Sequence, residues 1–323
     1  MSLEVKNIVK KYGDKTVVNN LSFKMNEPGV YALLGTNGAG KTTTIRIILG
    51  MLSKDEGEVL WNGEVLDALN TNIGYLAEER GLYPKYSLLD QLLYFAKLKE
   101  VPKEEAKKRI KYWAERLEVE EYIYPNQKSG KNTKSKNAKS KNVKSKSMNA
   151  DQLSKGNQQK IQLMAALISD PDIIILDEPL SGLDPVNTDL FKTIIREEIA
   201  KNKYLIMSSH QMSTIEEFCT DITILNRGNV VLQGNLNAIK KSYGRVNMYV
   251  RCEEDIESYI SQFDFAEVNR NAEEYEIKVK EEAQAREFLN TLVKNNITII
   301  KYELSEPSLH EIFVEKVGNA NEE

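Results

Sequence analysis

The segment GTNGAGKT, residues 35–42, constrains the fold of this chain more than any other stretch. It fits the pattern G-x-x-x-x-G-K-[ST], follows the apolar stretch GVYALLG and opens an expected helix over residues 41–52. Glycines in such a loop let backbone N–H groups curl around phosphate oxygens, and the helix N-terminus adds partial positive charge. The segment therefore predicts a nucleotide-phosphate site in which Lys41 reaches the outer phosphates and Thr42 holds Mg²⁺. A glycine-rich turn without a ligand is the alternative, and the flanking strand and helix disfavour it.

The segment IIILDEP, residues 173–179, supplies the expected second half of this site. Its apolar run predicts a buried strand that ends at Asp177, where Mg²⁺ or its bound water is expected. Glu178 follows directly and is placed to polarise an attacking water molecule. Adjacent acids after a buried strand can also be a solvated strand end, but the phosphate loop upstream disfavours that interpretation.

Apolar patterning divides the chain into two parts. In the first part strands alternate with helices, which implies an α/β fold with a mostly parallel sheet. Its strands are expected within residues 2–34 and over 57–61, 73–76, 171–179 and 203–210, and its helices over 41–52, 87–100, 103–122, 154–169 and 187–202. A helix and a hairpin are expected over 210–234. From about residue 243 the pattern restarts, which predicts a small α+β domain with strands over 246–252, 274–280 and 297–304 and helices over 253–263, 281–295 and 308–317.

The stretch KNTKSKNAKSKNVKSKS, residues 131–147, lies just before the segment LSKGNQQK. It contains a five-residue repeat and no apolar periodicity, which predicts a disordered, solvent-exposed insertion over about residues 127–149. Residues 128–147 hold eight lysines and no acid, so the rest of the chain has 36 basic and 48 acidic residues, a balance of −12. We therefore expect no non-specific binding of nucleic acid by the body of the protein.

Two roles for the lysine-rich insertion compete with that of an inert, tolerated expansion. Contact with the anionic inner leaflet of a membrane is one, because each nearby lysine could add about 1 kcal/mol. This hypothesis fails if deleting residues 128–147 leaves sedimentation with liposomes unchanged. Contact with nucleic acid is the other, and it is disfavoured because the stretch lacks interleaved aromatic residues and arginines. The inert expansion is the favoured interpretation.

The lengths of the apolar runs and the cysteine pattern predict a cytoplasmic protein. The longest apolar runs, such as residues 173–176, are far too short to cross a bilayer, and the first residues lack the apolar stretch of a signal peptide. The two cysteines, Cys219 and Cys252, form no metal-type spacing and indicate a reducing compartment.

Several ordered motifs give the chain a family resemblance. LSKGNQQK resembles a family signature of the LSGGQ type, SGLDP at residues 181–185 resembles a D-loop, and His210 resembles a switch histidine. Together with Walker A and Walker B motifs at residues 35–43 and 173–178, they make roughly residues 1–235, apart from the insertion, similar to the ATP-binding subunits of ABC transporters. The resemblance implies ATP and Mg²⁺ as ligands. The implied nucleotide-binding residues of Walker A are Gly35, Thr36, Asn37, Gly38, Ala39, Gly40, Lys41, Thr42 and Thr43.

The resemblance also implies roles for residues outside the phosphate loop. Two subunits, identical or paralogous, would bind head to tail with ATP between them. Ser154 and Gly156 would then face the γ-phosphate of the partner's nucleotide, and Asp184 would couple the two sites. Glu178 would act as general base, His210 would contact the γ-phosphate, and Tyr12 would stack on adenine. The implied metal-binding residues are Thr42, Asp177 and Glu78.

The sequence departs from the family pattern at three positions of these motifs. Lys155 stands where most members have glycine, and Asn157 stands where most have glutamine. Glu78, in GYLAEERGLYP, stands where most members have the glutamine of the Q-loop. A carboxylate is also a hard oxygen donor for Mg²⁺, but it adds negative charge near the phosphates, so turnover is expected to be altered. GYLAEERGLYP and LSKGNQQK together resemble one branch, the ATPases of bacterial sodium and drug exporters.

The resulting expectation is an α/β protein with a P-loop NTPase core of the ABC ATPase type. Residues 1–235 would form this domain, with an antiparallel β subdomain and a helical subdomain. Residues 236–323 would form a C-terminal accessory α+β domain, which the tail SEPSLHEIFVEKVG resembles. The expected function is an ATPase that energises a separate membrane-spanning permease, from the inner face of a bacterial plasma membrane.

Two rival functions remain at this stage. A non-transport ABC ATPase acting on ribosomes or nucleic acid usually carries two ATPase domains in one chain, whereas this sequence has one Walker A motif and one signature. A chromosome-maintenance or repair ATPase would have long coiled-coil heptads between the motifs, and none are present.

Overall fold

The structure is a computed structural model that describes residues 1–78, 81–125 and 147–319. These residues form two compact units. The first unit comprises residues 1–210 and 225–230, and the second comprises residues 211–224 and 231–323. Most of the predicted insertion lies outside the described residues. Its last three predicted residues, 147–149, belong to the folded part, because the Met148 carbonyl accepts a hydrogen bond from the Leu88 N–H at 2.9 Å.

The first unit contains an antiparallel sheet of four strands in the order β2-β1-β4-β5. Burial alternates over residues 3–5 of β1 and 21–25 of β2, because successive side chains of a strand point to opposite faces of the sheet. The strands are β1 (Leu3–Tyr12), β2 (Lys15–Met25), β4 (Glu56–Trp61) and β5 (Glu64–Val65).

A second sheet has the order β10-β9-β3-β8-β7-β6, and its strands β3, β8, β7 and β6 run parallel. The strands β3, β7 and β8 are buried along their whole length, as their unbroken apolar sequences predict for a parallel sheet. The strands are β3 (Gly29–Gly35), β6 (Ile73–Leu76), β7 (Ile173–Asp177), β8 (Tyr204–Ser209), β9 (Asp221–Asn226) and β10 (Asn229–Asn235).

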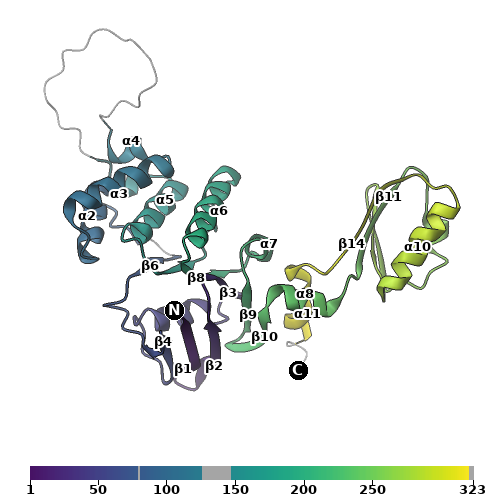
Figure 1. The fold of residues 1–323 in the computed structure, drawn as a ribbon, viewed down its shortest axis with the longest axis horizontal. Coiled ribbons are helices and arrows are strands. Elements are labelled where there is room, and N and C mark those ends of the chain that lie inside the picture. The colour runs from purple at the N-terminus through teal and green to yellow at the C-terminus, as the bar shows by residue number, and fades with distance from the viewer. Residues whose placement is uncertain (79–80, 126–146, 320–323) are drawn as a thin grey trace, which may run out of the picture. The chain divides into compact units, whose positions relative to one another are not determined.

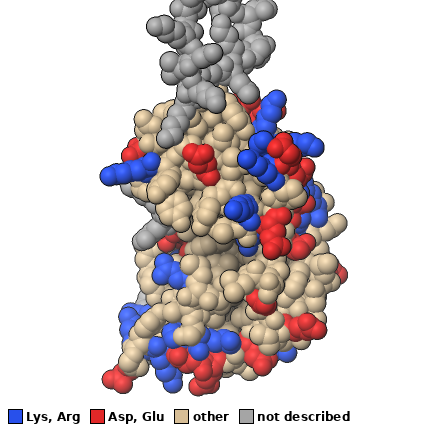
Figure 2. Space-filling model, turned by 90° about the vertical axis from the view of Figure 1, so that its left-hand side faces the viewer, with Lys and Arg blue, Asp and Glu red and all other residues tan. Residues whose placement is uncertain are grey.

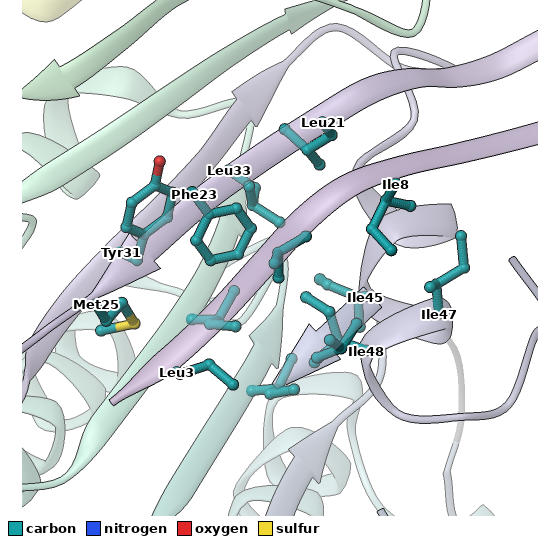
Figure 3. Packing of buried hydrophobic residues seen from close by; sticks show 14 of the residues in the cluster. Leu3, Ile8, Leu21, Phe23, Met25, Tyr31, Leu33, Ile45, Ile47 and Ile48 are labelled. Atoms are coloured by element: carbon teal, nitrogen blue, oxygen red, sulfur yellow. The ribbon is translucent and has the colours of Figure 1, made fainter. Parts of the chain in front are cut away.

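The core of the first unit lies between the antiparallel sheet, strand β3 and the first helix. Figure 3 shows Leu3 and Ile8 of β1, Phe23 of β2, Leu33 of β3 and Ile45 of the helix converging on one apolar region. Phe23 also stacks on Tyr31, with ring centroids 4.2 Å apart. This packing fixes the loop that joins β3 to the helix.

Several helices of the first unit form a cluster. In Figure 1, α2 to α5 gather at one end of the unit, and α2, α3 and α5 contact one another. The helix α1 follows the phosphate loop, and α6 precedes β8. The bounds are α1 (Lys41–Ile48), α2 (Leu88–Leu98), α3 (Lys103–Arg116), α4 (Glu120–Ile123), the 3₁₀ turn η1 (Ala150–Gln152), α5 (Lys155–Leu167) and α6 (Pro185–Ala200).

The second unit is built on an antiparallel sheet in the order β12-β13-β11-β14. One face of this sheet packs against α10, with Phe288 and Leu292 fully buried in a core of its own. The elements are α7 (Met212–Glu216), α8 (Leu236–Tyr243), β11 (Asn247–Cys252), α9 (Glu257–Ile260), β12 (Glu267–Asn271), β13 (Glu274–Lys278), α10 (Glu282–Lys294), β14 (Ile299–Ser305) and α11 (Leu309–Asn319).

The mixed α/β architecture predicted from the sequence is present, with three differences in detail. The helix predicted over residues 103–122 is broken, because it ends at Arg116 and α4 begins only at Glu120. The helix predicted over 253–263 forms only at residues 257–260. The elements β5, η1, α8 and β12 were not predicted at all. Within the described residues, no helix is long and apolar enough to span a membrane.

Candidate nucleotide-binding and catalytic site

The loop between β3 and α1 is built around glycine. Gly40 has a φ of 108°, a conformation that side chains rarely adopt, and a β-carbon there would lie 2.6 Å from the Val17 carbonyl oxygen. The Ala39 N–H donates to the Thr36 carbonyl at 3.1 Å, which closes the loop on itself. The helix α1 then begins at Lys41, so its first backbone N–H groups face the loop.

The side chain of Lys41 is buried inside this loop. Its ammonium donates to the Gly35 carbonyl at 2.8 Å and to the Thr36 carbonyl at 3.4 Å. It also lies 3.5 Å from the Glu178 carboxylate. A lysine held by carbonyls and a carboxylate is ready to exchange these partners for phosphate oxygens.

Asp177 ends β7 and is fully buried beside the first turn of α1. Its Oδ1 accepts hydrogen bonds from Ser208 and, at 3.5 Å, from Thr42, whereas its Oδ2 has no partner. Burial raises the pKa of Asp177, and the hydrogen bonds from Ser208 and Thr42 oppose that shift. A buried carboxylate oxygen without a partner is costly unless a cation or water completes it.

Glu178 occupies the centre of the site. Its backbone has a φ of 50°, a strained conformation for a residue with a side chain, and its N–H donates to the Ser208 hydroxyl at 3.0 Å. One carboxylate oxygen faces Lys41, and the other lies 2.9 Å from the Nδ1 of His210. Because β7 and β8 are parallel and pair Asp177 with Ser208, both acids and the histidine reach the same end of the sheet.

The phosphate loop, the start of α1 and Glu178 surround a cavity of about 210 Å³. Its lining consists of Val17, Asn37, Gly38, Ala39, Gly40, Lys41, Thr42, Thr43, Glu78 and Glu178. Glu78, just after β6, thereby lies beside the phosphate loop. Tyr12 is half exposed on β1 and does not line this cavity, although the Lys10 ammonium lies 5.5 Å from its ring.

Comparison with known proteins agrees with this geometry. The family described as "ABC transporter" matches residues 18–181, which include both halves of the site. The chain belongs to the ABC transporter ATP-binding family. A second family, described as "ATP-binding protein DrrA1-3-like, C-terminal domain", matches residues 234–317.

Relatives resemble this ABC ATP-binding protein over nearly its whole length. An uncharacterized ABC transporter ATP-binding protein, YhaQ of Bacillus subtilis, is 38% identical over 98% of each chain. The linearmycin resistance ATP-binding protein LnrL of the same species is 27% identical over 98% of each chain. The Nod factor export ATP-binding protein I of Burkholderia orbicola is 29% identical over 74% of this chain and 73% of its own.

A solved structure confirms the fold of this ABC protein. It is described as an ATP-binding subunit of an ABC transporter, has 27% sequence identity and gives a TM-score of 0.64. The similarity covers 76% of this chain and 94% of the other. The α/β fold predicted from the Walker motifs is therefore confirmed.

ATP and Mg²⁺ fit the residues at this ABC site. The glycine loop leaves room for phosphates, and the unpartnered Oδ2 of Asp177 and the Thr42 hydroxyl supply hard oxygen donors. Among the described residues, no group of three or more His, Cys, Asp or Glu side chains is arranged to hold a metal. Mg²⁺ in proteins is usually held by one or two side chains together with substrate phosphates and water.

The signature and the D-loop of this ABC protein lie against each other. Ser154 caps α5 by accepting a hydrogen bond from the Asn157 N–H at 3.3 Å, and Asp184 caps α6 by accepting one from Asn187 at 3.0 Å. That bond from Asn187 lowers the pKa of Asp184. A β-carbon on Gly156 would contact the Asn187 amide at 3.5 Å. Ser154, Gly156 and Asp184 do not line the cavity around Lys41.

Two residues of the site were missed by sequence reasoning. Ser208 bridges Asp177 and the Glu178 N–H, and Val17 of β2 lines the phosphate cavity. The signal for Ser208 was present, because polar residues ended the otherwise apolar stretch KYLIMSSH at the same sheet edge. Val17 gave no signal, since its contact depends on how the antiparallel sheet packs over the loop.

Proposed function

We propose that this chain is an ATP-hydrolysing subunit that drives a separate membrane-spanning permease of the exporter type. The observation that carries the hydrolytic part is the position of Glu178, a strained acid held between Lys41 and His210. In this proposal Glu178 accepts a proton from the attacking water, and His210 positions the γ-phosphate. Mg²⁺, when bound at Thr42 and Asp177, would neutralise charge on the phosphate oxygens, with Glu78 as a further candidate ligand.

We further propose that two subunits, identical or paralogous, enclose ATP. This accounts for the absence of Ser154, Gly156 and Asp184 from the cavity around Lys41, because these residues would contact the nucleotide of the partner. The capped N-terminus of α5 carries the partial positive charge that suits a phosphate group. Tyr12 would stack on the adenine, as its exposed ring allows.

An apolar groove on the first unit supports a permease partner. It has a volume of about 440 Å³ and is lined by residues of β6, α2, α5 and the segment that follows α1, which include Met51, Phe95 and Leu98. Met51 and Leu98 are more than half exposed, which suits the burial of an apolar segment from another protein. Figure 2 shows a face on which Lys and Arg are interspersed with Asp and Glu around a largely uncharged area. Such a face offers no continuous basic surface for nucleic acid.

Export is proposed from the relatives, whose names include Nod factor export and linearmycin resistance. The corresponding location is the cytoplasmic face of a bacterial plasma membrane. Contact of residues 128–147 with anionic lipid remains a separate hypothesis about that location.

Hydrolysis is tested with Glu178→Gln, which we expect to bind ATP normally and to lose nearly all turnover with Mg²⁺ present. Glu64→Gln is the matched control, because Glu64 is exposed on β5 and does not line the phosphate cavity. Substantial turnover by Glu178→Gln would show that another group is the base.

The partner is tested by capturing tagged Glu178→Gln protein from native membranes with ATP and identifying the bound proteins by mass spectrometry. We expect a protein with several membrane spans, and we expect Leu98→Glu to abolish its recovery. Val65→Glu, which alters an equally exposed residue of β5, should leave recovery unchanged. Recovery of ribosomal proteins without a permease would favour the non-transport alternative.

A further inference from the structure

A second cavity, of about 650 Å³, adjoins the phosphate cavity. It is lined by Glu78, Asp151, Leu153, Lys155, Gln158, Gln159, Gln162, Glu178 and Ser181. Glu78 and Glu178 line both cavities, so the second space reaches the candidate catalytic centre. The residues come from η1, α5 and the segments that follow β6, η1 and β7, all within the first unit.

Glu78 and Lys155 are two of the three positions at which the motifs of this chain depart from the family pattern. Glutamine and glycine, both neutral, are usual there, whereas this chain has a carboxylate and an ammonium. The structure brings both departures to one cavity, although 77 positions separate them in the sequence. Their charges are opposite, so the second departure offsets the charge that the first adds beside the phosphates.

The charged groups that line this cavity differ in their partners. The Glu178 carboxylate is already engaged by Lys41 and His210. Among the contacts of the described residues, neither the Glu78 carboxylate nor the Lys155 ammonium has a hydrogen bond or an ion pair. Asp151 is a third acid on this lining and is exposed on η1. Lys155 therefore has two candidate carboxylate partners, Glu78 and Asp151.

The position of Lys155 favours a role inside the cavity. Its ammonium lies 2.8 Å from the point where a β-carbon on Gly182 would sit, so the side chain folds over the D-loop, next to Ser181. The cavity is also polar at depth. Gln159 is more than nine-tenths buried, and its Oε1 has no partner while its Nε2 donates to the Pro179 carbonyl at 2.6 Å. The Glu78 and Lys155 side chains are both exposed, so their opposite charges can approach each other across this space.

We propose that Glu78 and Lys155 are positioning residues that form an ion pair across this cavity when nucleotide is bound. The pair joins the end of β6 to the first turn of α5, and so it fixes the signature relative to Glu178. This inference rests on the proposed ATPase function. It assigns the Glu78 carboxylate to Lys155 rather than to Mg²⁺.

The pairing predicts that removing one charge is worse than removing both, because a single change leaves an uncompensated charge near the phosphate site. The test measures kcat, KM and the Mg²⁺ dependence of ATP hydrolysis for Glu78→Gln, Lys155→Met and the double variant. We expect each single change to lower kcat about tenfold with little change in KM, and the double variant to recover to within about threefold of the unmodified protein. Lys155→Arg, which keeps the charge, should retain activity.

Control measurements separate the alternatives. Asp151→Asn removes a neighbouring acid of the same cavity and should change kcat by less than about twofold. Thermal unfolding without nucleotide should be nearly equal for all variants, which excludes misfolding as the cause of a lower kcat.

Three results would overturn the pair. One is a double variant in which the fold loss of kcat equals the product of the fold losses in the two single variants. Another is a lowered kcat in Asp151→Asn that does not fall further when Lys155→Met is added. The third is a raised Mg²⁺ requirement in Glu78→Gln that Lys155→Met leaves in place, which would identify Glu78 as a metal ligand. An unmodified protein that hydrolyses no ATP would instead refute the proposed function itself.

Discussion

Glu178 combines three properties that rarely meet in one residue. It is almost fully buried, its backbone φ is positive, and its carboxylate contacts both a lysine and a histidine. Strain of this kind costs of order 1–3 kcal/mol and persists only where the surroundings hold the residue in place. Here Ser208 does so, since its hydroxyl accepts the Glu178 N–H and donates to Asp177. The conformation of the candidate base therefore depends on a serine of the neighbouring strand.

Ser208→Ala tests this dependence. It leaves Asp177 Oδ1 with only the long bond from Thr42 and removes one of the two acceptors of the Glu178 N–H. We expect a loss of about 1–3 kcal/mol in the free energy of unfolding, because buried polar groups lose partners, and a lower kcat for ATP hydrolysis. Urea unfolding and steady-state kinetics measure the two effects. Ser53→Ala, at an exposed serine, is the control, and equal behaviour of both variants would contradict the role of Ser208.

Cys219 gives a second prediction at the residue scale. Burial raises the pKa of its thiol from 9.0 to about 12. Between these values the folded state binds more protons than the unfolded state, so this group's contribution to stability is present below about pH 9 and is lost as pH rises. In a Cys252→Ser variant we expect almost no reaction of the folded protein with a thiol reagent at pH 8, and one equivalent after unfolding. Rapid labelling of the folded variant would contradict this.

The packing of α5 on β6 is decided by Gly74. Its backbone is not in the left-handed region, so the reason for glycine is close approach: a β-carbon would lie 2.3 Å from the Ala166 carbonyl oxygen and 2.8 Å from Pro171. This contact holds the helix of the signature beside the strand that leads to Glu78. The close approach of α5 to β6 therefore requires glycine at position 74.

Gly74→Ala should therefore push α5 away from β6. We expect a loss of about 1–3 kcal/mol in the free energy of unfolding, the usual effect of overpacking a tight core. Denaturant unfolding followed by circular dichroism measures it. Gly81→Ala is the matched control, because its nearest neighbouring atom lies 4.0 Å from the new β-carbon. Similar losses in both variants would show that the contact at Gly74 relaxes without cost.

The elements also show what sequence patterns can predict. Strands β3, β7 and β8 and helix α6 follow from long apolar runs or regular periodicity, and the phosphate loop follows from glycine spacing. Strand β12 was missed because all five of its residues are exposed, so it has no apolar alternation, and its existence depends on pairing with β13. Helix α8 was missed although Asn235 caps it through the Ala238 N–H, because only two of its residues are buried. The cavity shared by Glu78 and Lys155 had no sequence signal, since it depends on tertiary packing.

At the scale of the whole molecule, each of the two units has a hydrophobic core of its own among the described residues. One contains Phe23, Leu33 and Ile45, and the other contains Met248 and Phe288. The sequence predicted a boundary at residues 235 and 236, whereas the contacts assign residues 211–224 to the second unit as well. Glu216 of α7 explains the difference, because it accepts a hydrogen bond from the Leu309 N–H at 3.1 Å and pairs with Lys240.

Because the cores are separate, we expect two unfolding transitions. Nucleotide should raise the stability measured in one of them. We expect ATP with Mg²⁺ to bind the unit that contains the phosphate loop, so at a ligand concentration of 100 times Kd it should stabilise that unit by about 2.7 kcal/mol. The second transition should not move. Unfolding of the isolated fragments 236–323 and 211–323 assigns the second transition to its part of the chain. The longer fragment should be the more stable, because it keeps the contacts of Glu216. A single transition that ATP shifts as a whole would show that the two cores unfold together, and equal stability of the fragments would place the boundary at residue 236.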